Sequence, residues 1–310
     1  MANTEPVQEI IQGQSMADYL LIPMDSRSSL VDQLDSPELY FGKHVDGSID
    51  RKVETPGMTL GTMIDAFITE DVLPSEPVLP DNVVIADSSI CKTNGARNPT
   101  GKLWKAFAEE NPGKEIRTPR QMEKEQIEHD ANVAICYRVR DQIRAHRGAR
   151  RVLLSDDRIA QPTIIAKING LWIKSRPDVV PARFQVCGDL KVSGAINPKF
   201  YCNRVSDYGY DIQGWLSVTA WHKVTQEPPR KFVNVVVRAK EPYDVAAYEL
   251  SPEFMKRGQA LAMQAIDDIK RCQDSGQWRT EDFGDIVMVD PPRYMRVSNR
   301  DEREAAEQAE

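Results

Sequence analysis

The sequence predicts an α/β fold in which a mixed central β-sheet is flanked by helices and preceded by a helical N-terminal part. Apolar residues recur at helical spacing through the first half of the chain, whereas they alternate in the manner of strands from residue 162 onward. The later segments then give a helix, two strands and a final helix. This succession of helices, strands, helix, strands and helix is typical of an α/β core.

Composition places the chain among ordinary globular proteins. Its 310 residues are 41% hydrophobic and 28% charged, enough for one large domain or two modest ones. It has no run of about 18 apolar residues and no secretory signal at its acidic N-terminus, so we expect no membrane segment. Five cysteines without a CxxC pair favour reduced thiols in the cytoplasm and give a zinc site little support.

A net charge of −7 argues mildly against a nucleic-acid-binding protein, because phosphate contacts usually come from basic surface. It does not exclude one. A carboxylate metal site adds formal negative charge that the bound metal reverses locally. A basic run also occurs at residues 146–151, for which a solvated helix end is the simpler interpretation.

The first half of the chain contains three predicted helices and one irregular connection. Ser26 is placed to cap a short helix that ends before Pro37. Residues 58–68 are apolar at helical spacing. Residues 71–100 are rich in proline and show little periodicity, so we expect a long irregular connection there. The longest helical pattern follows at residues 118–147.

The second half predicts strands and helices in alternation. Three strands with period-two patterns form a meander, at residues 162–168, 171–180 and 183–192. The remaining predicted elements are a helix, two strands and a helix, at residues 205–224, 231–240, 243–250 and 252–272.

Two acids and a lysine gather at one point of the predicted meander. Side chains of a strand alternate between faces, so Asp189 and Lys191 project from one face while Leu190 lies on the other. If the strands pair as a hairpin centred on residues 183–184, Asp178 lies directly opposite Asp189, with the Cβ atoms about 5 Å apart.

Two carboxylates at that separation repel each other, and a divalent cation removes the repulsion. Oxygen ligands favour Mg²⁺, with Mn²⁺ as a substitute. Lys191 would lie one side-chain length from the metal, where it can orient or deprotonate an attacking water or neutralise charge on a scissile phosphate. From the pattern alone, a surface salt bridge between Lys191 and either aspartate is an equal alternative.

The order "RPD", strand, "DLK" resembles the signature of the PD-(D/E)xK nucleases, with Asp178 as the first acid and Asp189-Leu190-Lys191 as the D-x-K. The surroundings resemble the RecE exonuclease (exonuclease VIII) family of phages and prophages over residues 26–282. The motifs behind this second resemblance are, in chain order, Ser28-Ser29-Leu30, Leu60-Gly61-Thr62, Gly170-Leu171, Tyr208-Gly209-Tyr210-Asp211-Ile212-Gln213 and Gly276-Gln277-Trp278.

The resemblance implies a restriction-endonuclease-like core and a Mg²⁺-dependent exodeoxyribonuclease. Such an enzyme degrades linear duplex DNA from 5′ to 3′ and leaves a 3′ single strand for recombination. A ring-shaped homo-oligomer and a single-strand annealing protein as partner are also implied. On this basis we divide the chain into an N-terminal tail (1–25), a helical and irregular N-terminal part of the nuclease domain (26–115), the nuclease core (116–297) and a disordered tail (298–310).

Two positions depart from the family. Asp65 stands where the family usually has a metal-binding histidine, and Gln161 where it often has a glutamate. Aspartate is itself a hard oxygen ligand, so we predict metal ligation by Asp65, Asp178, Asp189 and the Leu190 carbonyl. An acid on the helix surface is the alternative for Asp65. Gln161 brings no charge, and we expect it to contact DNA.

Tyr210 and Gln213 lie three residues apart and therefore share a helix face. We predict that Gln213 serves catalysis, and that Tyr210 and Arg176 contact DNA. Simple helix packing is the alternative for Tyr210. Three functions remain open: an exonuclease on DNA ends, an endonuclease on the same fold, and a catalytically impaired DNA-end-binding or scaffolding protein, which the two departures motivate.

Overall fold

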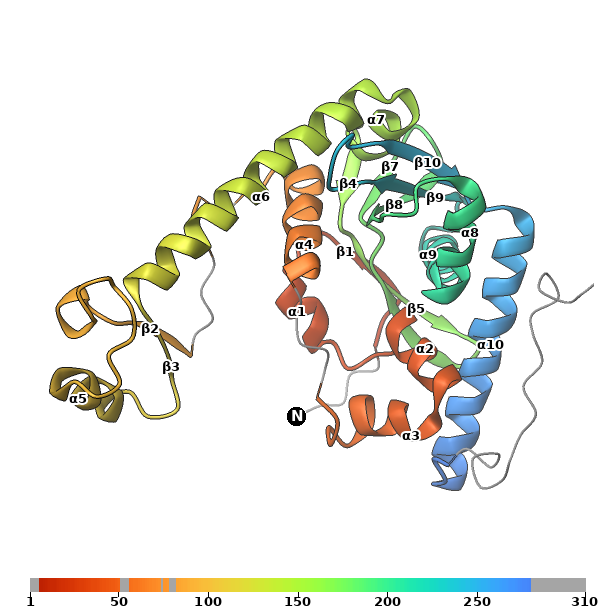
Figure 1. Cartoon of the computed structure of the whole chain (residues 1–310). Helices are drawn as coiled ribbons and strands as arrows, with labels where there is room; N and C mark the ends of the chain where they lie inside the picture. The colour runs from red at the N-terminus through yellow and green to blue at the C-terminus, as the bar shows by residue number, and fades with distance from the viewer. Residues whose placement is uncertain (1–5, 51–55, 74, 78–81, 280–310) are drawn as a thin grey trace, which may run out of the picture.

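A five-stranded mixed sheet forms the centre of the computed structural model, in the spatial order β10-β9-β8-β7-β4 (Figure 1). The parallel pairing of β8 with β9 makes the sheet mixed, since its other three pairings are antiparallel. The strands are β4 (Arg158–Ala160), β7 (Val179–Pro181), β8 (Val186–Val192), β9 (Lys231–Val237) and β10 (Val245–Glu249). The structure describes residues 6–50, 56–73, 75–77 and 82–279, so the predicted tail at 298–310 lies outside the described residues.

A second sheet of three strands has the order β1-β5-β6, with bounds Glu9–Ile11, Thr163–Ile168 and Leu171–Ser175. The predicted three-strand meander is therefore wrong in one respect. Its middle strand, predicted at 171–180, breaks at Pro177 into β6 and β7, which belong to different sheets. Proline has no backbone N–H to donate to a ladder, which accounts for the break. Strand β1 comes from the segment expected to be a tail.

Helices cover both faces of the central sheet (Figure 1). One core cluster combines β5 and β6 with α8 (Pro198–Asp207), α9 (Tyr210–Thr225) and α10 (Pro252–Ser275). The other combines the opposite face with α4 (Pro56–Thr69), α6 (Pro119–Ala145) and α7 (Arg147–Leu153). Alternation along β8 sends Cys187 into the first cluster and Val186 and Leu190 into the second, as predicted.

The predicted helices at 58–68, 118–147 and 252–272 correspond to α4, α6 and α10, and the helix predicted after Ser26 is α2 (Arg27–Asp35). The single helix predicted at 205–224 is wrong, because the chain turns at Gly209 between α8 and α9. Gly209 has a φ of +62°, and a Cβ there would lie 2.9 Å from Val31 Cγ2. Both facts favour glycine at this turn.

An arm projects from the core along α6 (Figure 1). Its far end holds the parallel pair β2 (Val83–Ile85) and β3 (Glu115–Arg117), a 3₁₀ turn (Ser88–Ile90) and α5 (Lys102–Glu110). The base of the molecule holds α2 with α1 (Met16–Leu21), α3 (Pro37–Tyr40) and a π-helical turn (Phe41–Val45). Among the described residues, no helix combines the length and apolar character needed to cross a membrane.

Candidate active site

The hairpin of β7 and β8 sets Asp178 and Asp189 opposite each other. Val179 pairs with Gly188 in antiparallel register, so the residues one step further out also face each other, as predicted. Gly188 permits the close approach, since a Cβ there would lie 2.8 Å from Val179 Cγ2 on β7. The carboxylate of Asp178 accepts a hydrogen bond from the Leu190 N–H. The first predicted acid is thus fixed to the strand that carries the second.

Asp189 is fully buried and held from two sides. Its Oδ2 forms an ion pair with Lys191 Nζ, and its Oδ1 accepts a 2.6 Å hydrogen bond from Gln213 Nε2 on α9. The Lys191 side chain is only 17% exposed. The pair is therefore not the surface salt bridge considered from the sequence. It lies between β8 and α9, on the face where alternation places both residues.

Gln161 links Asp65 to the hairpin. Its side-chain amide donates to Asp65 Oδ2 at 2.9 Å and to Thr69 Oγ1 at 3.2 Å, and its backbone N–H donates to the Asp178 carbonyl at 2.8 Å. Gln161 is buried and has a φ of +41°, a backbone region that non-glycine residues rarely adopt. Asp65 is thus a bound, partly buried acid rather than a free acid on the helix surface.

Arg176 continues this chain of contacts away from the hairpin. Its guanidinium donates to Gln161 Oε1 at 2.8 Å, and to the backbone carbonyls of Gln14 and Ser15 at 2.8 and 3.3 Å. Backbone carbonyls of the N-terminal segment thus accept hydrogen bonds from Arg176, a residue predicted to contact DNA. A cavity of about 610 Å³ opens here, with Ser15, Asp65, Gln161 and Arg176 in its wall.

The acids of the site shift one another's pKa values. Burial, then the charge of Asp189, raises the pKa of Asp65 to about 7. Burial, then the charges of Asp189 and Asp65, raises the pKa of Asp178 well above its usual range. Burial opposes the ammonium of Lys191, but the charges of Asp189 and Asp178 outweigh it and raise the pKa of that lysine. One ammonium faces three acids, so ionisation of all three would give the site an excess of negative charge that a cation would relieve.

The donor set fits a divalent cation by its chemistry. Asp65 Oδ1 is buried and accepts no hydrogen bond from the residues that the structure describes, and all three acids supply hard oxygen ligands. Within the described part of the chain, no three His, Cys, Asp or Glu side chains are arranged as an assembled metal site. Lys191 and Gln213 contact the two Asp189 oxygens, and the Leu190 N–H donates to Asp178 Oδ2. These contacts account for the lack of an assembled three-ligand site among the described residues.

Tyr210 lies beside the same group of residues. Lys191 Nζ is 4.9 Å from the centroid of its ring. The structure therefore brings Tyr210 and Gln213 together on the face of α9 that meets Lys191 and Asp189, as predicted. Packing also contributes, since the Tyr210 ring stacks on Tyr201 with centroids 6.4 Å apart.

Asn234 is a further polar residue beside the site that was not among the predicted site residues. This residue lies on β9 in register with Asp189 and is fully buried, and its side chain interacts with the hydroxyl of Tyr201. A fully buried amide in register with Asp189 is a candidate member of the site. Its signal was present, because Asn234 is the one polar residue inside the apolar run Phe232–Val237.

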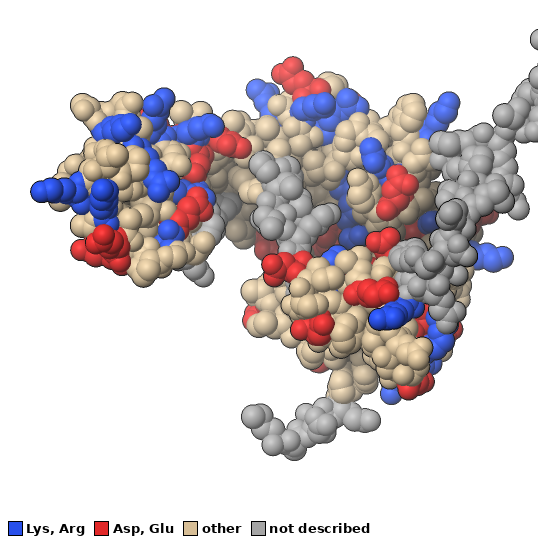
Figure 2. All heavy atoms as spheres, turned by 60° about the horizontal axis from the view of Figure 1, so that its bottom comes forward, with Lys and Arg blue, Asp and Glu red and all other residues tan. Residues whose placement is uncertain are grey.

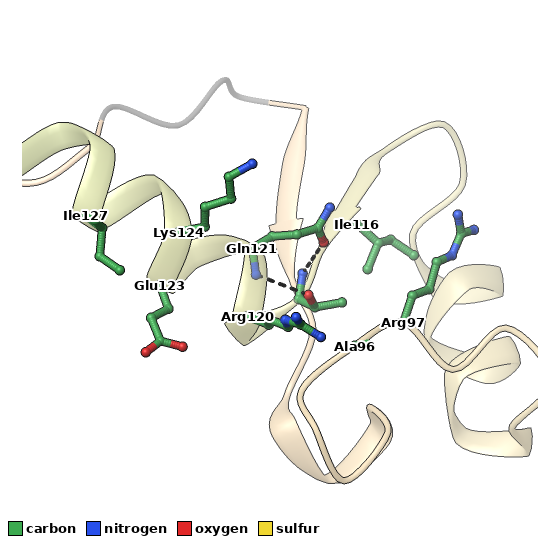
Figure 3. A pocket seen from close by; sticks show the side chains of 9 residues that line it. Ala96, Arg97, Ile116, Arg120, Gln121, Glu123, Lys124 and Ile127 are labelled. Carbon is green, nitrogen blue, oxygen red and sulfur yellow. Dashed lines mark hydrogen bonds between the residues drawn. The ribbon is translucent and has the colours of Figure 1, made fainter.

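The arm contains a second hollow, of about 570 Å³, which includes none of the predicted site residues. Figure 3 shows Arg97, Arg120 and Lys124 around it, together with Ile116 and Ile127. These three cations are exposed and form no ion pair within the described residues. Figure 2 shows lysines and arginines spread over this lobe. The hollow is therefore a basic surface feature at a distance from the acids.

The mixed sheet, its flanking helices and the hairpin with Asp178, Asp189 and Lys191 define a domain of the PD-(D/E)xK class. The chain belongs to the family described as a PDDEXK-like domain of unknown function (DUF3799), which matches residues 26–282. The predicted class and fold are confirmed.

A crystal structure of a "putative exonuclease" from Eubacterium rectale shares the fold. It matches 91% of this chain and 97% of its own, with a TM-score of 0.55 and 14% identity. The crystal structure of SSO0001 matches 71% of this chain and 88% of its own at 12% identity, with a TM-score of 0.26 that is too low to indicate a shared fold. No curated protein matches the chain.

Proposed function

We propose that this protein is a divalent-metal-dependent nuclease that degrades linear duplex DNA from its ends. The observation behind the proposal is the meeting of two aspartates and a lysine at the β7–β8 hairpin of a PDDEXK-like domain. Asp178 and Asp189, with Asp65 and the Leu190 carbonyl, would hold Mg²⁺ or Mn²⁺. A bound metal there would polarise the scissile phosphate and supply a water nucleophile at neutral pH.

The chain's own residues would orient and stabilise the reacting groups. The raised pKa of Lys191 keeps its amine protonated, so it suits neutralising charge on the phosphate better than removing a proton from water. Gln213 would fix the orientation of Asp189, and Gln161 that of Asp65.

Two observations favour an active enzyme over an impaired scaffold. Asp65, one of the two departures from the family pattern, is a carboxylate held beside the hairpin by Gln161. One of its oxygens is buried and has no hydrogen-bond partner among the described residues. The other departure, Gln161, has all of its side-chain polar groups engaged in ordering the site. The name of the Eubacterium rectale protein favours exonuclease over endonuclease activity.

Contact with the DNA backbone would come from the arm. Residues 82–127 carry eight lysines and arginines against six aspartates and glutamates, a charge of +2 in a chain of net charge −7. Duplex DNA is bound chiefly through its phosphates, and a locally basic surface suits that contact. From the family resemblance we further propose 5′-to-3′ polarity, a ring-shaped oligomer and a single-strand annealing partner.

The test compares linear and closed-circular duplex DNA, with Mg²⁺, with Mn²⁺ and with a chelator. We expect loss of linear DNA only, in either metal, and none with the chelator. Cutting of the circles would show an endonuclease instead. Binding of linear DNA without degradation in either metal would show an impaired site. End-labelled substrates give the polarity, since a 5′ label is released first in 5′-to-3′ digestion.

A further inference from the structure

Helix α8 displays aromatic side chains to solvent. Phe200 is 59% exposed and Tyr208 is 48% exposed, and exposed Arg204 lies between them. The three residues are spaced four apart, so they follow one side of the helix and span about 12 Å along its axis. We call these three residues the α8 stripe. Tyr201 and Val205 are buried, and they fix the side of α8 next to the stripe against the core.

The members of the stripe form a surface of flat groups. The guanidinium carbon of Arg204 lies 5.7 Å from the centroid of the Tyr208 ring. Single exposed apolar residues are common, but two aromatic rings flanking an arginine form a surface of the kind that stacks on other planar groups. The nearby charges are Lys199 and Arg204 against Asp207, so the surface has a small excess of positive charge.

The stripe is held in position at its C-terminal end. Arg27 on α2 donates a 2.9 Å hydrogen bond to the Tyr208 carbonyl. Gly209 follows with a left-handed backbone conformation, at a place where a Cβ would come too close to Val31 Cγ2. The turn that presents Tyr208 is therefore fixed to a neighbouring helix, and ring stacking there costs little ordering of the protein.

The stripe is continuous with the candidate active site. The Tyr208 ring stacks on Tyr210, with centroids 5.7 Å apart and planes inclined by 24°. Lys191 Nζ lies 4.9 Å from the Tyr210 ring and pairs with Asp189. Contacts thus run without a break from the solvent-exposed ring of Tyr208 to the buried acid.

We propose that the α8 stripe is a stacking platform for unpaired nucleotides of the DNA strand next to the scissile phosphate. The inference rests on the proposed nuclease function and names which form of the DNA end the site prefers. Every base has a flat face, so aromatic rings bind single strands with little regard to sequence. Bases within a duplex are already stacked and paired and cannot use such rings. The platform therefore selects ends that carry, or can fray into, a short single strand.

The test measures binding without cleavage, by fluorescence anisotropy of labelled DNA with a chelator present. Three DNAs are compared: a blunt duplex, the same duplex with a short unpaired tail, and that duplex with an abasic tail. The wild-type protein should bind the tailed duplex more tightly than the other two. Tyr208→Leu and Phe200→Leu keep apolar bulk but remove the flat ring, and each should weaken tailed-duplex binding by about fivefold to a hundredfold.

Two matched variants complete the test. Tyr208→Phe keeps the ring and should bind like the wild type. Tyr137→Leu removes a ring on α6 that is 47% exposed and lies outside the stripe, and it should also leave the tail preference unchanged. Circular dichroism and thermal melting confirm that each variant is folded. Blunt-duplex binding should change less than twofold in all of them.

The platform is refuted if the wild type shows no tail preference, if an abasic tail binds equally well, or if the leucine variants weaken blunt and tailed DNA alike. These outcomes are separate from failure of the proposed function. A protein that prefers base-containing tails through Tyr208 yet cleaves no DNA in Mg²⁺ or Mn²⁺ would retain the platform and lose the nuclease assignment. A protein that cleaves DNA but shows no preference for tailed ends would retain the nuclease assignment and lose the platform.

Discussion

Gln213 on α9 donates a 2.6 Å hydrogen bond to Oδ1 of Asp189, a residue 24 positions earlier on β8. Since Lys191 pairs with the other oxygen, the two partners together fix the plane of a fully buried carboxylate. A carboxylate held in this way has its orientation fixed before a cation binds. Gln213 is therefore a positioning residue for Asp189.

Replacing Gln213 with alanine should lower kcat for DNA cleavage by about ten- to a hundredfold, the usual effect of losing an outer partner of a metal ligand. The metal concentration needed for half-maximal activity should rise by a similar factor. Gln213→Asn, which has the same amide on a shorter side chain, is the matched control for loss of reach. Activity within twofold of wild type in Gln213→Ala would show that the hydrogen bond is only structural.

Asp189→Ala and Lys191→Ala should each abolish cleavage while the protein still folds. Breaking a buried ion pair is costly, by about 3–5 kcal/mol, so both variants should also melt at a lower temperature. Asp189→Asn retains the shape and an acceptor for Gln213, and it isolates the loss of the charge. Cleavage assays, with circular dichroism as the control for folding, make the measurement. Full activity in any of these variants would refute the assigned roles.

The raised pKa values predict how stability depends on pH. The pKa of Asp65 is about 7 in the fold against 3.8 as the ordinary value, so the native state binds more protons than the unfolded state between these values. The unfolding free energy of the metal-free protein should therefore fall with rising pH across that window, and Asp178 acts in the same direction.

A divalent cation binds the deprotonated acids, so it should stabilise the protein more above the Asp65 pKa than below it. Thermal melting with and without Mn²⁺ tests this. The rise in Tm should be larger at about pH 8 than at about pH 5, and Asp65→Asn should reduce the difference. An equal rise at both pH values would argue against metal binding by these acids.

The chemistry-bearing hairpin could be predicted from the sequence because its determinants are local. Alternation along β8 sets the faces of Asp189 and Lys191, and the tight turn before β8 sets the register that brings Asp178 opposite. The division of the predicted strand at 171–180 into β6 and β7 was not predicted, although Pro177 within it indicated a break. What decides the split is the pairing of β6 with β5 and of β7 with β8, which strand patterns alone do not specify.

Other features depend on contacts between distant segments. Strand β1 has only three residues and exists through its pairing with β5, about 150 residues away along the chain. The link from Asp65 through Gln161 to Arg176 joins α4 to the strands by side-chain hydrogen bonds. The hydrophobic periodicity of the sequence does not predict such side-chain hydrogen bonds between distant segments. Asn234 had a local signal, but its proximity to Asp189 follows from the parallel β8–β9 pairing.

Asp65→His should retain or improve activity, because histidine is the residue that the family resemblance implies at this position. The imidazole supplies a neutral nitrogen ligand in place of a carboxylate whose pKa burial has raised. Asp65→Ala removes the ligand altogether and should weaken metal binding. Cleavage rates across a range of Mg²⁺ and Mn²⁺ concentrations separate the variants. A complete loss of activity in Asp65→His would show that the carboxylate has a role of its own.

We propose that the two facing aspartates of the β7–β8 hairpin, with Asp65 beside them, bind one divalent ion. Crystals soaked in Mn²⁺ test it most directly, through the anomalous signal of the metal. We expect one strong peak between the carboxylates of Asp178 and Asp189, which disappears in Asp189→Ala. A map without a peak at that position under saturating Mn²⁺, or with the metal bound only elsewhere, would contradict it.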